Sequence, residues 1–154
     1  MYKEMRRKDR ELNSNDAMEI LKNNTYGILS TIGEDGYPYG VPVSYALHNN
    51  SIYFHCAVKG HKLENILSNN KVSFCVVGQT NVLPGEFSTK YESAVVFGSA
   101  AEAFDDEKNM ALLEIINKYS PDYIEEGTEY INRSGKSTRV IKISIEHISG
   151  KARK

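Results

Sequence analysis

Three basic side chains surround a glycine directly after a short aromatic segment of the sequence: Lys59, Gly60, His61 and Lys62. Residues 52–56 are typical of a strand, and a helical pattern begins at His61. The first N–H groups of a helix have no partner within the helix and carry the positive end of its dipole, so they bind phosphate well. A glycine lets the backbone approach an anion, and the cations donate charge-assisted hydrogen bonds. We therefore predict a site for the phosphate of a cofactor that lies along the strand.

The strand before this site carries two further side chains with chemistry of their own, His55 and Cys56. Neighbouring strand residues point to opposite faces, so one of the two can face the cofactor. His55 is a candidate to orient a substrate or to supply a proton, because its pKa lies near working pH; the alternative is a half-buried strand histidine bonded to a carbonyl group. Cys56 is more typical of a packing residue than of a nucleophile. A zinc site shared with His61 is disfavoured, because the ligands diverge and a fourth is not evident.

Composition limits the classes of function. The 154 residues are 40% hydrophobic and 25% charged, which is ordinary for a globular protein with one core. A net charge of −1 gives no general attraction to nucleic acid or to an anionic membrane, and no apolar run approaches the length of a membrane span. Two cysteines are too few for a disulfide scaffold, so we expect a cytoplasmic protein with reduced thiols. The basic stretches 6–10 and 151–154 are expected to be solvated termini.

Hydrophobic periodicity predicts a mainly β protein with flanking helices, in a single domain over residues 1–154. Turn residues at 33–36 and 48–50 separate successive apolar segments and indicate hairpins. The predicted strands cover 26–32, 39–47, 52–56, 71–77, 91–104 and 138–145, and the predicted helices begin after the capping run 13–16, at 61, at 105 and after 120. Six strands rich in hairpins favour a six-stranded antiparallel barrel over a doubly wound sheet.

Some details of this arrangement are specific enough to check. Gly98 is expected to bend the strand 91–104. The segment 78–90 contains Pro84 and Gly85 and is predicted to be a long connection, of the kind that is usually functional or lies in an interface. The helix 105–119 is expected to bury a face made by Leu112, Leu113, Ile116 and Tyr119.

The sequence also resembles a known family. The segments that carry the resemblance are Gly33-Glu-Asp-Gly-Tyr-Pro-Tyr-Gly-Val-Pro42, Tyr53-Phe-His-Cys-Ala-Val-Lys-Gly-His-Lys62 and Tyr91-Glu-Ser-Ala-Val-Val-Phe-Gly98, with further similarity at 5–10 and 147–151. Together they are similar to the pyridoxamine 5′-phosphate oxidase-like FMN-binding split barrels, and most similar to the nitroimidazole-resistance-related branch. This resemblance implies a six-stranded split barrel and a homodimer with two FMN sites at the dimer interface.

The resemblance also implies which residues hold FMN. The strand before the second helix corresponds to the flavin-binding strand, so His55, Cys56 and Ala57 are expected along the ring edge and the ribityl chain. Lys59, Gly60, His61 and Lys62 are expected at the phosphate, and Val41, Pro42, Val43 and Ser44 are expected to offer backbone groups to the pyrimidine side of the ring. Lys90, Tyr91, Glu92 and Ser93 correspond to the segment that reaches across from the partner subunit.

Two departures from the family pattern narrow the expected activity. The oxidase proper has an arginine on the second strand, where Gly40 or its neighbours stand here, and its C-terminal arginine-bearing substrate signature is absent. Both departures count against oxidation of pyridoxamine phosphate. The resemblance instead implies an FMN-dependent oxidoreductase that reduces a small, flat acceptor such as a nitroaromatic, with His55 as the catalytic residue. A non-catalytic flavin, heme or deazaflavin module, such as a redox sensor or carrier, is the alternative.

Overall fold

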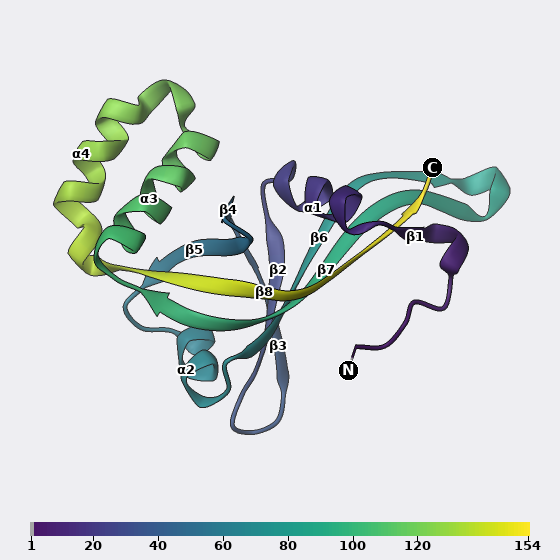
Figure 1. Ribbon diagram of the computed structural model, residues 1–154, viewed down its shortest axis with the longest axis horizontal. Coiled ribbons are helices and arrows are strands. Elements are labelled where there is room, and N and C mark those ends of the chain that lie inside the picture. The colour runs from purple at the N-terminus through teal and green to yellow at the C-terminus, as the bar shows by residue number, and fades with distance from the viewer. Residues whose placement is uncertain (1) are drawn as a thin grey trace.

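The computed structural model describes residues 2–154 and has one large antiparallel sheet (Figure 1). Seven strands follow the order β3-β2-β6-β7-β8-β5-β4, and β1 pairs with β8 outside this path. The bounds are β1 Glu11–Leu12, β2 Gly27–Ile32, β3 Pro38–Val43, β4 Ala46–His48, β5 Ser51–Ala57, β6 Lys71–Leu83, β7 Ser88–Ala103 and β8 Thr138–Arg153. The two ends of the sheet, β3 and β4, pack on the same apolar core. The fold is therefore the predicted antiparallel split barrel with flanking helices, although it has more than six strands.

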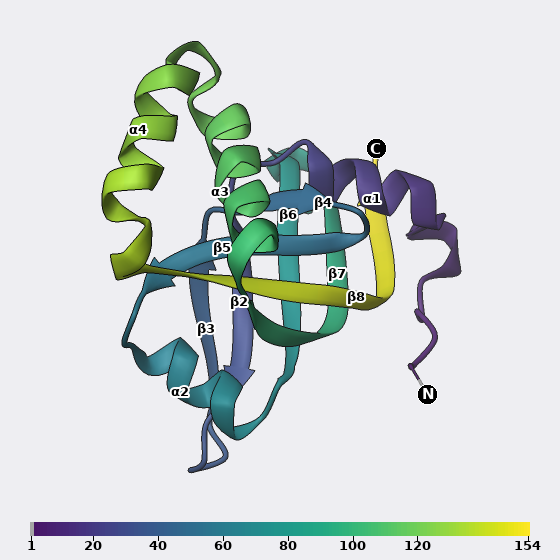
Figure 2. The same cartoon turned by 60° about the vertical axis from the view of Figure 1, so that its left-hand side comes forward.

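Four α-helices flank the sheet. Their bounds are α1 Ser14–Lys22, α2 His61–Ser68, α3 Asp105–Tyr119 and α4 Ile124–Ser134. Helices α1 and α2 lie at opposite ends of the barrel, and α3 and α4 form a hairpin that projects from its side (Figure 2). No helix between residues 2 and 154 is long and apolar enough to cross a membrane.

The barrel interior is filled by alternate residues of the long strands. Phe54, Phe74, Val96 and Ile143 are fully buried there, as expected for strands that turn every second side chain inward. A second, smaller cluster lies on the outer side of β5, where α3 covers it; it consists of Tyr53, Ala103, Ala111, Leu112 and Val140. These two clusters hold the two faces of β5 in place.

Helices α1 and α2 are attached to the barrel by caps and buried side chains. The side chain of Asn13 accepts a hydrogen bond from the N–H of Asp16, so the predicted cap of the first helix is confirmed. In α2, Leu63 and Ile66 enter the core, and the buried amide of Asn65 donates to the hydroxyl of Thr31 over 2.9 Å. Because this buried hydrogen bond has both partners satisfied, it orients the start of α2 relative to β2.

The predicted strand 39–47 is interrupted, which is one difference from the sequence-based expectation. It consists of β3 and β4, separated by Ser44 and Tyr45. Tyr45 is fully buried and its hydroxyl donates to the carbonyl of Leu21, while its own N–H donates to the hydroxyl of Tyr119 over 2.8 Å. These tertiary hydrogen bonds replace ladder bonds at this point, so the strand breaks where the sequence pattern shows no break.

The predicted connection 78–90 is also different: most of it is strand. Strands β6 and β7 continue as a hairpin, paired from Thr80–Tyr91 to Leu83–Ser88, and only a short turn at 84–86 separates them. None of its residues is buried, so the extension lacks the alternating apolar pattern that identifies a half-buried strand. The predicted bend at Gly98 is confirmed by a register shift between β7 and β8 at Phe97 and Gly98.

Helix α3 has the predicted bounds but a partly different buried face. Ala111, Leu112 and Ile115 are buried, whereas Leu113 is 38% exposed. The helix lies against β4, β5 and the hairpin partner α4 at the same time, and this three-sided contact rotates the buried face away from the expected one. Strand β8 also runs eight residues beyond the predicted end at 145, because its second half pairs with both β7 and β1.

Candidate functional site

The start of α2 has the features of an anion site. Gly60 is the N-cap residue and no side chain caps the helix, so the N–H groups of its first turn face outward without a side-chain partner. A Cβ atom on Gly60 would have no other atom within 4 Å, so the space above this residue is open. Neither Lys59 nor Lys62 has a carboxylate within ion-pair distance in residues 2–154. Both ammonium groups are therefore available to an anion.

A groove of about 450 Å³ begins at this point and runs between α2 and the strands β7 and β8. Its apolar wall includes Leu63, Ile66, Ala100 and Ile141. Its charged end carries Lys59, Arg139 and two carboxylates, Glu64 and Glu102. A volume of this order suits a small-molecule ligand.

Arg139 is a site residue that sequence reasoning missed. It lies directly opposite Cys56 in the β5–β8 ladder, and its guanidinium donates to Glu102 over 2.7 Å. Directly opposed strand residues share one face, so Arg139 and Cys56 both face the barrel mouth. The sequence shows Arg139 only as an ordinary residue of the last predicted strand, because the β5–β8 register that brings it here connects residues more than 80 positions apart.

The environment of Cys56 is that of a packing residue. Desolvation raises the pKa of its thiol, while the nearby cations Lys62 and Arg139 lower it less strongly and Glu102 raises it further. The net shift is upward, so the thiol stays protonated at neutral pH. The cysteine is free and partly buried against the barrel core.

His55 faces the other side of β5, away from Cys56. It lines a small apolar cavity of about 120 Å³ beneath the α3–α4 hairpin, with Leu112, Ile115 and Ile131 among its neighbours. Desolvation lowers the pKa of His55 below its ordinary value, so the imidazole is neutral at pH 7. A neutral imidazole has one donor and one acceptor nitrogen, and His55 as a whole is exposed to solvent.

The segment Val41–Ser44 lies at an open edge of the sheet. Strand β3 is the last strand on its side and pairs only with β2, so the backbone groups of its outer edge have no strand partner. The ring of Tyr39 on this strand stacks on His61 at the start of α2, with ring centroids 4.0 Å apart. Ser44 lies two residues before Ala46, which pairs with Tyr53 of β5. The structure thus places the start of β3 beside the start of α2, which follows β5 in the chain.

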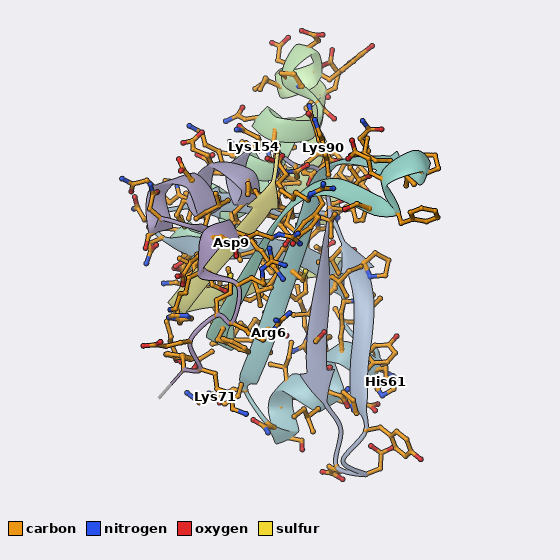
Figure 3. The ribbon with its side chains drawn as sticks, turned by 90° about the vertical axis from the view of Figure 1, so that its right-hand side faces the viewer. Arg6, Asp9, His61, Lys71, Lys90 and Lys154 are labelled. Atoms are coloured by element: carbon orange, nitrogen blue, oxygen red, sulfur yellow. The ribbon has the colours of Figure 1, made fainter. Side chains whose placement is uncertain are left out.

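The predicted residues 90–93 do not join this site within one chain. They lie at the beginning of β7, whereas the groove beside Lys59 contacts β7 at Ala100 and Glu102. At about 3.3 Å per residue, ten residues of strand separate these positions by roughly 30 Å. Figure 3 shows Lys90 at one end of the strands and His61 at the other. Glu92 is moreover held by the N–H of Gln79 in the β6 bulge, over 3.3 Å.

Metal binding finds no support in the described part of the chain: no three potential ligands from His, Cys, Asp and Glu gather within residues 2–154. His55, Cys56 and His61 in particular point to three different surroundings.

Comparisons with known proteins agree with this fold. A family model described as pyridoxamine 5′-phosphate oxidase matches residues 13–152. No curated protein matches the sequence. A Bacteroides thetaiotaomicron structure described as a candidate 5-nitroimidazole antibiotic resistance protein is 22% identical, with a TM-score of 0.75 over 92% of this chain and 85% of that chain.

Two mycobacterial structures are similar in shape at lower identity. A conserved hypothetical protein from Mycobacterium tuberculosis has a TM-score of 0.82 at 17% identity, covering 97% of this chain and 90% of that chain. An FAD- and heme-binding protein from Mycobacterium smegmatis has a TM-score of 0.82 at 18% identity, covering 94% of this chain and 74% of that chain. At these identities the structures share the fold.

Proposed function

The chain belongs to the pyridoxamine 5′-phosphate oxidase family, and on this basis we propose that it is a homodimeric FMN-binding oxidoreductase of the cytoplasm that reduces a small, flat acceptor such as a nitroaromatic. The observation that carries the proposal is the start of α2. There, two lysines without carboxylate partners, an uncapped helix terminus and open space above Gly60 lie beside the open edge of β3. These are the features that a phosphate-bearing cofactor needs.

The residues at the barrel split fit FMN in type and position. Lys59, Lys62 and the N–H groups after Gly60 would hold the phosphate, and Arg139 adds a third cation at the groove. The free edge of β3 at Val41–Ser44 would bond to polar atoms of the ring, as an exposed strand edge can. Bound FMN would supply the electron transfer, and the chain would position it and exclude water.

His55 is the residue we assign to the acceptor. Its imidazole is neutral and opens onto an apolar cavity, so its single N–H can donate a hydrogen bond to a nitro or carbonyl oxygen of the acceptor. Strand β3, which reads Pro-Tyr-Gly-Val-Pro-Val and carries Gly40 or its neighbours where the resemblance expects the arginine of the oxidase proper, has no cation to hold a phosphorylated pyridoxamine. The similarity to a candidate 5-nitroimidazole resistance protein supports a nitroaromatic as the first acceptor to test.

The homodimer is supported by two rows of uncharged side chains on the outer face of the sheet, where Tyr2 stacks on Phe97 and His147. One row of side chains crosses five strands through directly paired residues, namely Pro42, Ile28, Cys75, Val95 and Ser149. The next row contains Gly40, Ser30, Ser73, Phe97 and His147. Flat faces of small and apolar residues are typical of subunit interfaces. A second chain on this face would also bring Lys90–Ser93 toward the other subunit's α2, which one chain cannot do alone.

Flavin uptake is the first test. The full chain is purified after FMN supplementation, and its visible spectrum is compared with its concentration. We expect about one FMN for each chain. A colourless protein that takes up no FMN in a titration contradicts the proposal.

Turnover is the second test. The loaded wild type and His55→Ala are compared anaerobically for reduction of a nitroimidazole, with bound FMN quantified in both. We expect His55→Ala to lose about tenfold in rate, which corresponds to the loss of one hydrogen bond worth roughly 1.4 kcal/mol to the reacting acceptor. Equal rates would reduce His55 to a structural strand histidine.

A non-catalytic module is the second candidate function, because similar structures include an FAD- and heme-binding protein. The cavity beside His55 measures about 120 Å³, well below the roughly 300 Å³ at which ligand pockets begin, so it holds neither a flavin nor a heme and does not distinguish the two cofactors. A copurifying pigment with a Soret band, or a flavin that no acceptor reoxidises faster than oxygen does, would favour this candidate.

A further inference from the structure

The groove between α2 and the strands β7 and β8 is larger than the phosphate site at its end. It begins at Lys59 and Gly60 and continues along α2 to Leu67, with a volume of about 450 Å³. Seven residues of helix span roughly 10 Å, so the groove extends well beyond the space of one phosphate group. The proposed flavin phosphate therefore accounts for one end of the groove and leaves the rest of its length without an occupant.

Helix α2 separates this groove from the strand edge that we propose for the flavin ring. On the side of that edge, His61 stacks on Tyr39 of β3. The groove is lined from another side of the helix, by Glu64 and Leu67. The ring and the groove therefore lie on different sides of α2, and the phosphate site at the start of the helix lies between them.

The long wall of the groove is apolar and continues onto the surface. Leu63 and Ile141 belong to this wall and also to the barrel core. At its rim, Leu67 is 84% exposed and Val58 is 42% exposed. These side chains are contiguous with the wall and are not scattered singly, so they form one apolar slot that a flat ring could cover.

The opposite wall of the groove includes a free strand edge. Strand β7 pairs with β6 only as far as Ser99, and the N–H of the next residue, Ala100, donates to the carbonyl of Asn70 over 2.9 Å. Residues two apart along a strand present their backbone groups to the same edge, so the N–H and C=O of Glu102 also face this side. They offer the groove one donor and one acceptor. Adenine carries an amino donor beside a ring-nitrogen acceptor and matches such an edge.

The charged groups of the groove carry both signs. Arg139 and Glu102 are paired over 2.7 Å, whereas neither Lys59 nor Glu64 has an ion-pair partner in residues 2–154. A free carboxylate repels a purely anionic ligand but accepts hydrogen bonds from the hydroxyl groups of a ribose. The groove therefore suits a neutral group with hydroxyls, next to the phosphate end, as a nucleoside is.

We propose that the groove holds the adenosine half of a dinucleotide flavin, so that this chain binds FAD more tightly than FMN. The adenine lies between the apolar slot and the free edge of β7, and the ribose hydroxyls donate to Glu64. The two phosphates lie at the start of α2, where Lys59, Lys62 and Arg139 provide the positive charge. The inference rests on the proposed function and deepens it, because it names the form of the flavin that the same site takes.

The test is calorimetric titration of the full chain with FAD, with FMN and with AMP. We expect FAD to bind at least tenfold more tightly than FMN, because the adenosine adds an apolar contact and hydrogen bonds that FMN cannot make. AMP has the adenosine and one phosphate without the flavin, so it should bind at least tenfold more weakly than FAD and should be displaced by it.

Two variants locate the adenosine. Glu64→Gln is expected to weaken FAD roughly tenfold through the ribose, while FMN is not weakened. Leu67→Gln is expected to weaken FAD by a similar factor through the adenine and to leave FMN unchanged. Both side chains are exposed, so neither variant should unfold the chain. The matched controls are Glu126→Gln on α4 and Leu113→Gln on α3, which should bind both flavins as the wild type does.

The possible failures are distinguishable. If FMN binds and FAD binds no more tightly, the inference is wrong and the proposed flavoprotein stands; if neither flavin binds, both are wrong. AMP binding as tightly as FAD would make the groove a site for free adenine nucleotides. Tighter FAD binding by Glu64→Gln would show that this carboxylate only repels the phosphates, and equal losses of FAD and FMN in either variant would show a general effect on α2. Each of these results also overturns the inference.

Discussion

At the scale of single residues, the proposed anion site depends on charged lysine side chains, whereas the proposed acceptor site depends on an uncharged histidine. Lys59 and Lys62 lie at a helix terminus with no carboxylate of residues 2–154 within ion-pair distance. His55 is kept neutral by its apolar surroundings on the opposite face of the same strand. The phosphate site after the end of β5 and the acceptor site on the outer face of β5 are therefore separate.

Lys62→Ala is expected to weaken FMN by roughly ten- to a hundredfold, which corresponds to the roughly 1.5–3 kcal/mol of a charge-assisted hydrogen bond. Riboflavin lacks the phosphate, so it should bind weakly and respond little to the substitution. Flavin fluorescence titrations measure both ligands. Lys22→Ala, at the end of α1 and at the other end of the barrel, is the control and should leave both affinities unchanged. Equal losses for FMN and riboflavin would mean that Lys62 acts through folding.

Lys118 should make stability depend on pH. Its ammonium nitrogen is buried without a hydrogen-bond partner in residues 2–154, 3.8 Å above the ring of Tyr45, and desolvation lowers its pKa to about 8. The folded chain thus releases this proton near pH 8 and the unfolded chain only near its ordinary pKa of about 10.4. Between these values the unfolded state binds more protons, so the free energy of unfolding rises with pH.

We expect Lys118→Met to abolish this rise, which should amount to about 1–2 kcal/mol after allowance for partial exposure of the side chain. Urea unfolding of both proteins at pH 7 and pH 10 measures it. Lys136→Met, an exposed control, should follow the wild type. Parallel pH dependences of wild type and Lys118→Met would show that the ammonium group is solvated in solution.

At the scale of secondary structure, the long strands β7 and β8 depend on one bulge. The register between them shifts at Phe97 and Gly98, and a Cβ atom on Gly98 would overlap the backbone carbonyl of Ser144. Because of the bulge, the first half of β7 contributes side chains to the outer face of the sheet, and the second half lines the groove beside α2. A residue with no side chain is therefore required at the point where the two halves meet.

Gly98→Ala is expected to destabilise the fold by about 3 kcal/mol, because the obstructing atom belongs to the backbone and cannot turn away. Chemical denaturation gives the value. Gly85→Ala, in the turn of the β6–β7 hairpin where a Cβ meets nothing within 4 Å, should stay within about 0.5 kcal/mol of the wild type. A small effect at position 98 would mean that the β7–β8 register relaxes easily.

At the scale of the whole molecule, no α-helix of residues 2–154 covers one face of the sheet, and only the N-terminal segment lies across it, with Tyr2 stacked on Phe97 and His147 (Figure 3). Helices α1 and α2 lie at the ends of the barrel and α3 covers β4 and β5, so the outer side of β2, β3, β6 and β7 has no helix on it (Figure 2). Val77 and Phe97 are 53% and 43% exposed on this side. The proposed dimer would bury this face and complete the flavin site at once.

Val95→Glu should convert the dimer to a monomer, because it places an unpaired charge in the central row of this face. A buried unpaired charge costs roughly 3–5 kcal/mol, so the dissociation constant should rise at least a hundredfold. Sedimentation velocity at micromolar concentration, with FMN present, measures this change. Leu113→Glu, on the exposed side of α3, is the control and should remain dimeric. A wild type that is monomeric under the same conditions would contradict the dimer itself.

The sequence by itself determined the elements whose pattern is local. Turn residues and alternation predicted the hairpins and the barrel class, Asn13 predicted the cap of α1, and the glycine and cations at 59–62 identified the start of α2. Each of these depends on neighbours within a few positions, so a single sequence carries the information.

Tertiary structure alone decided what depends on distant pairing. The β5–β8 register brings Arg139 to Cys56, and the β1–β8 pairing brings Glu11 to Lys151, across 83 and 140 positions. The break at Tyr45 comes from tertiary hydrogen bonds, and the strand character of residues 80–83 comes from pairing with β7. Neither feature is accompanied by a periodic pattern of apolar residues in the sequence. A long-range register is set by the combined packing of all strands, so no local sequence pattern predicts it.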